Sequence, residues 1–143
     1  MKTLATLFTL LGVMAMLTPE SAFQTETFKA ESIAANYGIY RNAVNNYVTG
    51  NATVAEGIAI PSSLLALPSG WKPMRAWVSR LDGGNLYVWG PVEGSEADEI
   101  RKLFMNSYAI GVKRSGHLVN THGTGIALPS FIPENNIVSV ITP

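Results

Sequence analysis

The chain opens with an uninterrupted apolar run, Thr3 to Thr18, that contains no charged residue. Lys2 precedes the run, and Pro19-Glu20 closes it. As a helix the run would extend about 24 Å, against roughly 30 Å for the hydrocarbon core of a bilayer. Its length is compatible with a short membrane anchor or with the hydrophobic segment of a signal peptide.

The residues around this run favour the anchor. A cleaved signal peptide needs small residues at its cleavage site, but the best candidate, Ser21-Ala22, has Glu20 three residues before the cut. Because Lys2 lies before the run and mainly acidic residues follow it, the C-terminal part should face out of the cytoplasm, into the periplasm of a Gram-negative cell. We expect residues 1–20 to be a signal-anchor in the inner membrane. The alternative is a periplasmic or secreted protein after cleavage.

Residues 21–50 predict an amphipathic helix, the second of three segments in the chain. Its apolar stripe has spacings of 4, 3, 4 and 3 residues and consists of Ile33, Tyr37, Tyr40, Val44 and Tyr47. Polar residues occupy the rest of the helical wheel: Asn36, Arg41, Asn42, Asn45 and Asn46. The stripe should pack on the protein's own sheet, or alternatively against another membrane-anchored helix. Thr49-Gly50-Asn51 should end the helix through a left-handed glycine cap.

The third segment, residues 51–143, predicts a small periplasmic domain that begins with an extended connector. Three prolines exclude a continuous helix from residues 52–74, although Ile58 to Ile60 could add a short strand. Met74 to Leu81 and Leu86 to Trp89 then flank the turn sequence Asp-Gly-Gly-Asn, which predicts a β-hairpin.

Further elements complete an α+β fold. Ser95 and Asp98 fit a capping box, and the apolar spacing predicts a helix from Glu96 to Ser107. The remaining expected elements are a hairpin of Tyr108 to Arg114 with His117 to Thr121, a loop from Gly123 to Pro133, and a buried strand from Ile137 to Thr142. We expect an antiparallel sheet of four or five strands, covered by the two helices.

Composition narrows the possible functions. The 143 residues include ten basic and ten acidic side chains, so the chain lacks the positive charge expected of a nucleic-acid-binding protein. The chain contains no cysteine, which excludes disulfides and zinc–thiolate sites. Hydrophobic residues make up 47% of the chain. Part of this excess is the anchor, and the rest suggests apolar surface that a partner covers, although a small dry core would have the same composition.

The sequence offers no recognisable catalytic or metal site, and we expect neither an enzyme nor a bound cofactor. His117 and His122 do not match a compact metal-binding motif. The acidic cluster lies at a predicted helix start, where negative charge complements the helix dipole; it comprises Glu93, Glu96, Asp98 and Glu99.

Large aromatic side chains could form a platform for a glycan or peptide, or fill the core. They are Trp71, Trp77, Tyr87, Trp89 and Phe131. Because a small domain without disulfides needs large side chains to bury, we favour the core. Exposed tryptophans gathered on one face would support an exported binding domain or enzyme instead.

The order of segments is similar to the plan of type IV pilins, although the chain lacks their basic leader ending in glycine. In detail it resembles the PilM family of type IVB thin-pilus proteins encoded in conjugative-plasmid pilus operons. The resemblance rests on the N-terminal apolar helix, on residues 40–48 (YRNAVNNYV) and 86–91 (LYVWGP), and above all on residues 110–119 (IGVKRSGHLV) and 128–141 (LPSFIPENNIVSVI).

This resemblance implies a non-catalytic accessory component of pilus assembly in the inner membrane, with other pilus proteins or pilins as partners and no small-molecule substrate. A minor pilin-like subunit of the fibre is the alternative. The long loop from Asn120 to Pro133 is the first candidate contact surface, and the exposed side of the Ile33 to Tyr47 helix is the second. The corresponding candidate contact residues are His122, Phe131, Tyr37, Tyr40 and Tyr47.

Overall fold

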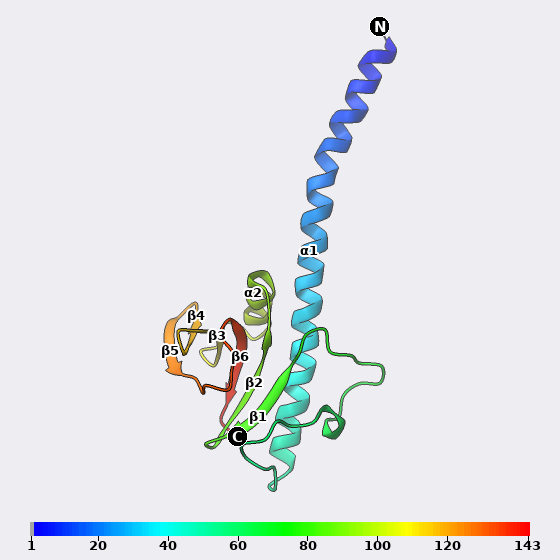
Figure 1. Cartoon of the computed structure of the whole chain (residues 1–143). Coiled ribbons are helices and arrows are strands. Elements are labelled where there is room, and N and C mark those ends of the chain that lie inside the picture. Colours follow the sequence, from blue (N-terminus) through cyan, green and yellow to red (C-terminus); the bar gives the residue numbers. More distant parts are fainter. Residues whose placement is uncertain (1) are drawn as a thin grey trace.

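The structure, a computed structural model, describes residues 24–143 together with the helical backbone of residues 2–23. Its first element is the helix α1, Lys2–Gly50 (Figure 1). Within the described residues no helical stretch is both long and apolar enough to cross a bilayer. The predicted signal-anchor, residues 1–20, lies outside the residues whose side chains are described.

Six strands form one antiparallel sheet in the order β1-β2-β6-β3-β4-β5. Their bounds are β1 Val78–Asp82, β2 Asn85–Pro91, β3 Ile110–Arg114, β4 His117–Asn120, β5 Gly123–Ala127 and β6 Asn136–Ile141. The predicted α+β class is confirmed, but the expected four or five strands become six. The extra strand is β5, which the sequence analysis placed in a loop, and it pairs with β4 along one edge of the sheet.

Both predicted hairpins are present and close on tight turns. Asp82 pairs with Asn85 across Gly83 and Gly84, whose φ angles of 58° and 82° lie in the left-handed region. Such angles match the two-residue turns that suit the right-handed twist of paired strands. The strand before this turn begins at Val78, later than the predicted Met74, because the preceding residues follow the connector.

The second helix, α2, spans Gly94–Leu103, and its N-cap lies two residues before the predicted one. Glu93 is its N-cap, and the carboxylate of Glu96 accepts a hydrogen bond from the Glu93 amide at 3.3 Å. The prediction that Ser95 and Asp98 cap this helix is therefore wrong, since the carboxylates of Glu93 and Glu96 fulfil both roles two residues earlier. The helix also ends at Leu103, before the predicted Ser107, because a hydrogen-bonded turn described below terminates it.

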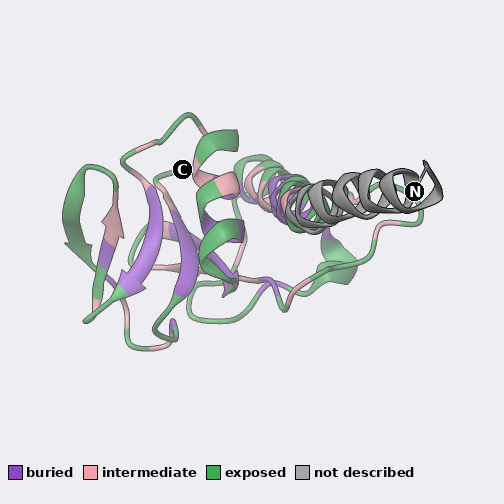
Figure 2. Cartoon of the chain, turned by 90° about the horizontal axis from the view of Figure 1, so that it is seen from above, coloured by how far each residue is buried: buried purple, intermediate pink, exposed green. Residues whose placement is uncertain are grey.

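The apolar stripe of α1 packs on the protein's own sheet, as the first alternative predicted (Figure 2). Tyr37 is fully buried, and its hydroxyl donates to the Val88 carbonyl at 2.9 Å and lies 2.6 Å from Ser139 Oγ. The Tyr40 hydroxyl lies 2.9 Å from Ser79 Oγ. Two polar hydroxyls thus cross the interface between helix and sheet with partners provided on the strands.

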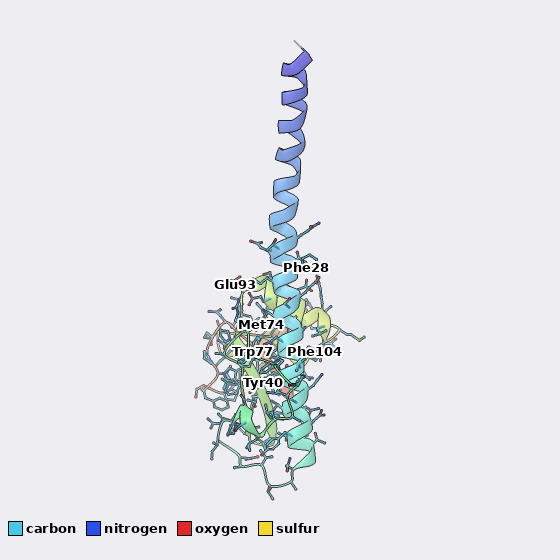
Figure 3. All side chains as sticks on the ribbon, turned by 90° about the vertical axis from the view of Figure 1, so that its right-hand side faces the viewer. Phe28, Tyr40, Met74, Trp77, Glu93 and Phe104 are labelled. Atoms are coloured by element: carbon cyan, nitrogen blue, oxygen red, sulfur yellow. The ribbon has the colours of Figure 1, made fainter. Side chains whose placement is uncertain are left out.

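Aromatic rings extend this interface on both sides of α1. The ring of Tyr37 meets Trp77 at 5.0 Å and Phe104 at 6.3 Å, both edge to face. Figure 3 shows Trp77 and Phe104 at one level along α1, to either side of the helix. The first core therefore joins α1, α2 and the sheet in one apolar cluster.

Asn36 differs from its predicted place on the polar side of α1, because it is 92% buried against the connector. Its amide donates to the Lys72 carbonyl at 2.8 Å, and its Oδ1 accepts from the Met74 amide at 2.8 Å and from Trp77 Nε1 at 2.7 Å. One side chain therefore fixes the proline-rich connector to α1.

The connector also covers the free edge of β1. Ala59 bridges to Arg80, the Gly57 amide donates to the Leu81 carbonyl at 2.8 Å, and the Ile60 amide donates to the Ser79 carbonyl at 2.9 Å. The predicted short strand at Ile58 to Ile60 thus occurs as an isolated bridge. An edge covered in this way cannot pair with another chain.

α1 ends at Gly50 as predicted, but Gly50 does not adopt a left-handed conformation. Side chains satisfy the final carbonyls instead: Thr49 Oγ1 donates to Asn45 at 2.7 Å, and Asn51 Nδ2 donates to Tyr47 at 2.8 Å. The prediction of a glycine cap is corrected to a side-chain cap.

A second, smaller core lies on the other face of the sheet. It consists of Tyr87, Trp89, Leu118, Leu128, Ile132 and Val138. The segment after β5 covers this face and is held by Lys113, whose Nζ donates to the carbonyls of Pro129 and Ile132 at 2.8 and 2.7 Å. Consecutive residues of β2 alternate between the two cores, so the central strands are buried on both sides.

Candidate interaction surface

The end of α2 forms a Schellman motif in which methionine occupies the position that usually holds glycine. The Asn106 amide donates to the Arg101 carbonyl at 2.8 Å, and the Met105 amide donates to the Lys102 carbonyl at 3.0 Å. Met105 and Asn106 have φ angles of 55° and 52°. These two hydrogen bonds define the motif and terminate the helix before Ser107.

The turn between β4 and β5 contacts the end of α2 through a histidine side chain. His122 Nε2 lies 2.6 Å from the Asn106 carbonyl, and its ring stacks on Tyr108 with centroids 3.7 Å apart. Asn120 Nδ2 donates to the carbonyls of Tyr108 and Ile110 at 3.2 and 3.1 Å, while Asn120 Oδ1 accepts from the His122 amide at 2.9 Å. Because a carbonyl can only accept, His122 Nε2 carries the proton in this contact.

Four exposed side chains lie on this framework or next to it along the chain, and we name them the α2–β3 surface: Leu103, Met105, Tyr108 and His122. Met105 is 91% exposed and Tyr108 is 75% exposed. The backbone beneath them is fixed by the Schellman motif and by the Asn120 hydrogen bonds. The surface is therefore an ordered apolar and aromatic patch, which is typical of the anchor residues of protein interfaces.

A guanidinium without a carboxylate partner borders the α2–β3 surface. Arg41 is on α1, and its Cζ lies 4.5 Å from the centre of the Phe104 ring. Phe104 is the residue between Leu103 and Met105 in the sequence. Its Nε is buried without a hydrogen-bond partner, and burial lowers the pKa of this guanidinium. Among the described residues no carboxylate pairs with Arg41, in contrast to Arg75, Arg80, Arg101 and Lys102.

The five candidate contact residues from the sequence have different environments. Tyr37 and Tyr40 are buried under α1, so a partner that docks on the folded domain would not reach them. Tyr47 is half-buried and lines a small apolar pocket of about 170 Å³ beside the connector. Phe131 packs on Tyr87 and Trp89 in the second core. Only His122 is exposed and belongs to the α2–β3 surface.

The aromatic residues fill the cores, as favoured from the sequence. Trp77 and Trp89 are buried in the first and second core respectively, on opposite faces of the sheet. Trp71 stacks on Tyr40 with ring centroids 6.1 Å apart. The tryptophans therefore do not form the exposed platform that would have supported a glycan-binding domain.

The acidic cluster at the start of α2 is paired within the fold. Arg75 donates to both carboxylate oxygens of buried Glu96, at 3.0 and 2.8 Å. Burial opposes ionisation of Glu96, but the bonds from Arg75 and the Glu93 amide outweigh it and hold the pKa of Glu96 below its usual value. Along α2, Asp98 pairs with Arg101 and Glu99 with Lys102. The described residues include no group of three acidic or histidine side chains suited to a metal ion.

A groove of about 510 Å³ separates α2 from β3 and β4. Val112 and Val119 contribute apolar surface, and the charged residues around it are Glu93, Asp98, Arg101 and Arg114. Two carboxylates balance two guanidinium groups, so the groove favours neither an anion nor a cation.

The sequence identified His122 as a contact candidate but not Met105 or Tyr108, and it placed Arg41 on the polar side of its helix without marking it as a contact. Met105 follows a helical pattern and carries no glycine or proline signal. Arg41 lies on a helix rich in asparagine, and its lack of a carboxylate partner among the described residues becomes evident only when its neighbours in the structure are known.

Comparison with known proteins identifies the family. The PilM family model matches residues 6–140. The crystal structure of a PilM protein from Escherichia coli B7A has a TM-score of 0.59 and 22% identity, over 81% of this chain and 94% of that chain, which supports the fold. No curated protein matches the chain in sequence. The family match covers all but the last three residues of the domain and part of the preceding apolar run, and the chain therefore belongs to the PilM family.

Proposed function

We propose that this protein is a non-catalytic accessory component of type IVB thin-pilus assembly. In this proposal, the Thr3 to Thr18 segment holds the chain in the bacterial inner membrane, with its N-terminus in the cytoplasm. Residues 51–143 and the second half of α1 then form a periplasmic domain that binds other pilus proteins.

The match to the PilM family over residues 6–140 carries this proposal. Membership of this pilus-associated family indicates a pilus-related function. The match begins inside the apolar run, so the family's pattern includes much of the proposed anchor together with the domain. The ordered, exposed α2–β3 surface supports a role in protein contacts.

A clean deletion in the native host tests the role in assembly. We expect pili to disappear in electron micrographs and to return when the full chain is supplied in trans. Normal pili in the deletion strain would refute an assembly role. If the protein instead copurifies with sheared fibres and does not stay with the membranes, it is a minor subunit of the fibre.

The intact mass and cellular fraction test the anchor. We expect the uncleaved chain in inner-membrane vesicles, and alkaline phosphatase fused after Pro143 should be active because that enzyme folds in the periplasm. A soluble chain that begins at Phe23 would show that the apolar run is a cleaved signal peptide and would refute the membrane-bound role.

A further inference from the structure

At Met105, the α2–β3 surface has an apolar side chain at a backbone position that favours glycine. Left-handed φ angles are costly for residues with a Cβ atom and cost glycine little. The Schellman position of Met105 is therefore one at which glycine would suit the fold better. Because Met105 is 91% exposed, its side chain returns little packing energy to the domain.

The neighbouring Tyr108 and His122 are also held in place without being covered. Their stacked rings are fixed through Asn106 and Asn120, yet 75% of Tyr108 remains exposed. Ordering an aromatic side chain before binding lowers the entropy that a partner must remove. The strained backbone and the ordered ring are separate observations, and both point to contact with another molecule.

Charge then selects the kind of partner. Arg41 lies on the ring of Phe104 at the border of this surface, and no carboxylate of the described domain pairs with it. A half-buried guanidinium gains most from a carboxylate that can accept two parallel hydrogen bonds.

We propose that the α2–β3 surface binds a partner segment that places apolar side chains on Met105 and Tyr108 and a carboxylate on Arg41. The partner is a different protein, and its setting in pilus assembly rests on the function proposed above. The chemistry of the segment rests only on the surface itself.

Photocrosslinking in the full chain tests this proposal. A benzoylphenylalanine residue at Met105 or Tyr108, in cells that express the complete set of pilus genes, should crosslink to one segment of another protein. Mass spectrometry should place an aspartate or glutamate within about one helical turn or two strand residues of the crosslinked site. Leu64 offers a matched control, since it is exposed and apolar but lies on the connector.

Substitutions separate the contact from the fold. Arg41→Met keeps the apolar stem over Phe104 and should lower the crosslink yield at least about tenfold, because the charge-assisted bonds are lost. Met105→Gly should lower pilus number to a similar degree while the domain stays folded. Leu64→Ala should change neither readout.

Several outcomes would overturn the proposal. They are a crosslink to a second copy of this chain, a crosslinked segment without a carboxylate, and full piliation by Met105→Gly in a host that loses its pili when the gene is deleted. If deletion of the gene leaves pili intact but the acidic segment of another protein is crosslinked, the surface is correct and the pilus role is not. If deletion abolishes pili but Met105→Gly restores them fully, the surface inference alone fails.

Discussion

Two regions of the domain use tyrosine in opposite ways. Under α1, Tyr37 is buried and its hydroxyl contacts Val88 and Ser139. On the α2–β3 surface, Tyr108 is held by a stacked histidine, and most of its ring faces solvent. The first arrangement satisfies the tyrosine hydroxyl within the chain, whereas the second leaves apolar area exposed and a cation without a carboxylate partner among the described residues. This difference separates residues that maintain the fold from residues that are available to a partner.

The largest expected effect is at the buried tyrosine. Tyr37→Ala should lower the free energy of unfolding by about 3–5 kcal/mol, because it leaves a cavity between Trp77 and Phe104. Guanidinium unfolding of the detergent-solubilised chain, followed by tryptophan fluorescence, measures the change. If this variant does not fold, Tyr37→Phe should fold with a loss of about 1–3 kcal/mol, since it removes only the hydroxyl. Losses below about 0.5 kcal/mol in both variants would contradict the described interface.

The second prediction concerns the attachment of the connector to α1. Asn36→Ala removes three hydrogen bonds and leaves buried Trp77 Nε1 without an acceptor, so we expect a loss of about 2–3 kcal/mol. The same unfolding measurement applies. Exposed Asn46→Ala is the matched control on the same helix and should stay within about 0.5 kcal/mol of the wild type. Equal effects in the two variants would show that the hydrogen bonds of Asn36 do not stabilise the attachment of the connector to α1.

The third prediction uses pH. Arg75 keeps the pKa of Glu96 low, so the ion pair stabilises the fold above about pH 4.5, the unfolded value, and this contribution is lost as pH falls. Arg75→Ala leaves a buried carboxylate and should cost about 2 kcal/mol at pH 7. Because that uncompensated carboxylate would bind a proton more readily in the folded state, the gap to the wild type should narrow toward pH 4. A gap independent of pH would contradict this assignment.

The smallest expected effect has the opposite sign. Met105→Gly should leave the free energy of unfolding unchanged or raise it by up to about 1 kcal/mol, because glycine adopts the left-handed position without strain. Met105→Ala retains a Cβ atom and should not gain this stability. A loss of more than about 1 kcal/mol in the glycine variant would mean that the exposed methionine contributes to folding after all.

The sequence was informative where local chemistry decides the structure. The hairpin turn at Gly83 and Gly84 follows from the residues of the turn alone. The stripe from Ile33 to Tyr47 predicts the buried side of α1 through its spacing, and a short apolar run predicts β6. In each case one period or one turn motif determines the outcome.

Elements that depend on distant partners could not be predicted in the same way. β5 contains two glycines and becomes a strand through pairing with β4. Asn36 is polar, yet the connector returns to bury it. Met105 is left-handed although no glycine marks the helix end, and the β4–β5 turn contacts this end through His122, which is 16 residues from Asn106 in sequence. Consequently the α2–β3 surface, apart from His122, became visible only in three dimensions.

The long contact between α1 and the sheet also has a mechanical consequence. Side chains from Ile33 to Val48 pack against the rest of the domain along one side of α1, with hydrogen bonds at Asn36, Tyr37 and Tyr40. A pull along the helix axis would load these contacts simultaneously, in shear, instead of peeling them apart one by one. The domain should therefore move with its helix as one rigid body, and displacement of α1 along its axis would move the α2–β3 surface by the same distance.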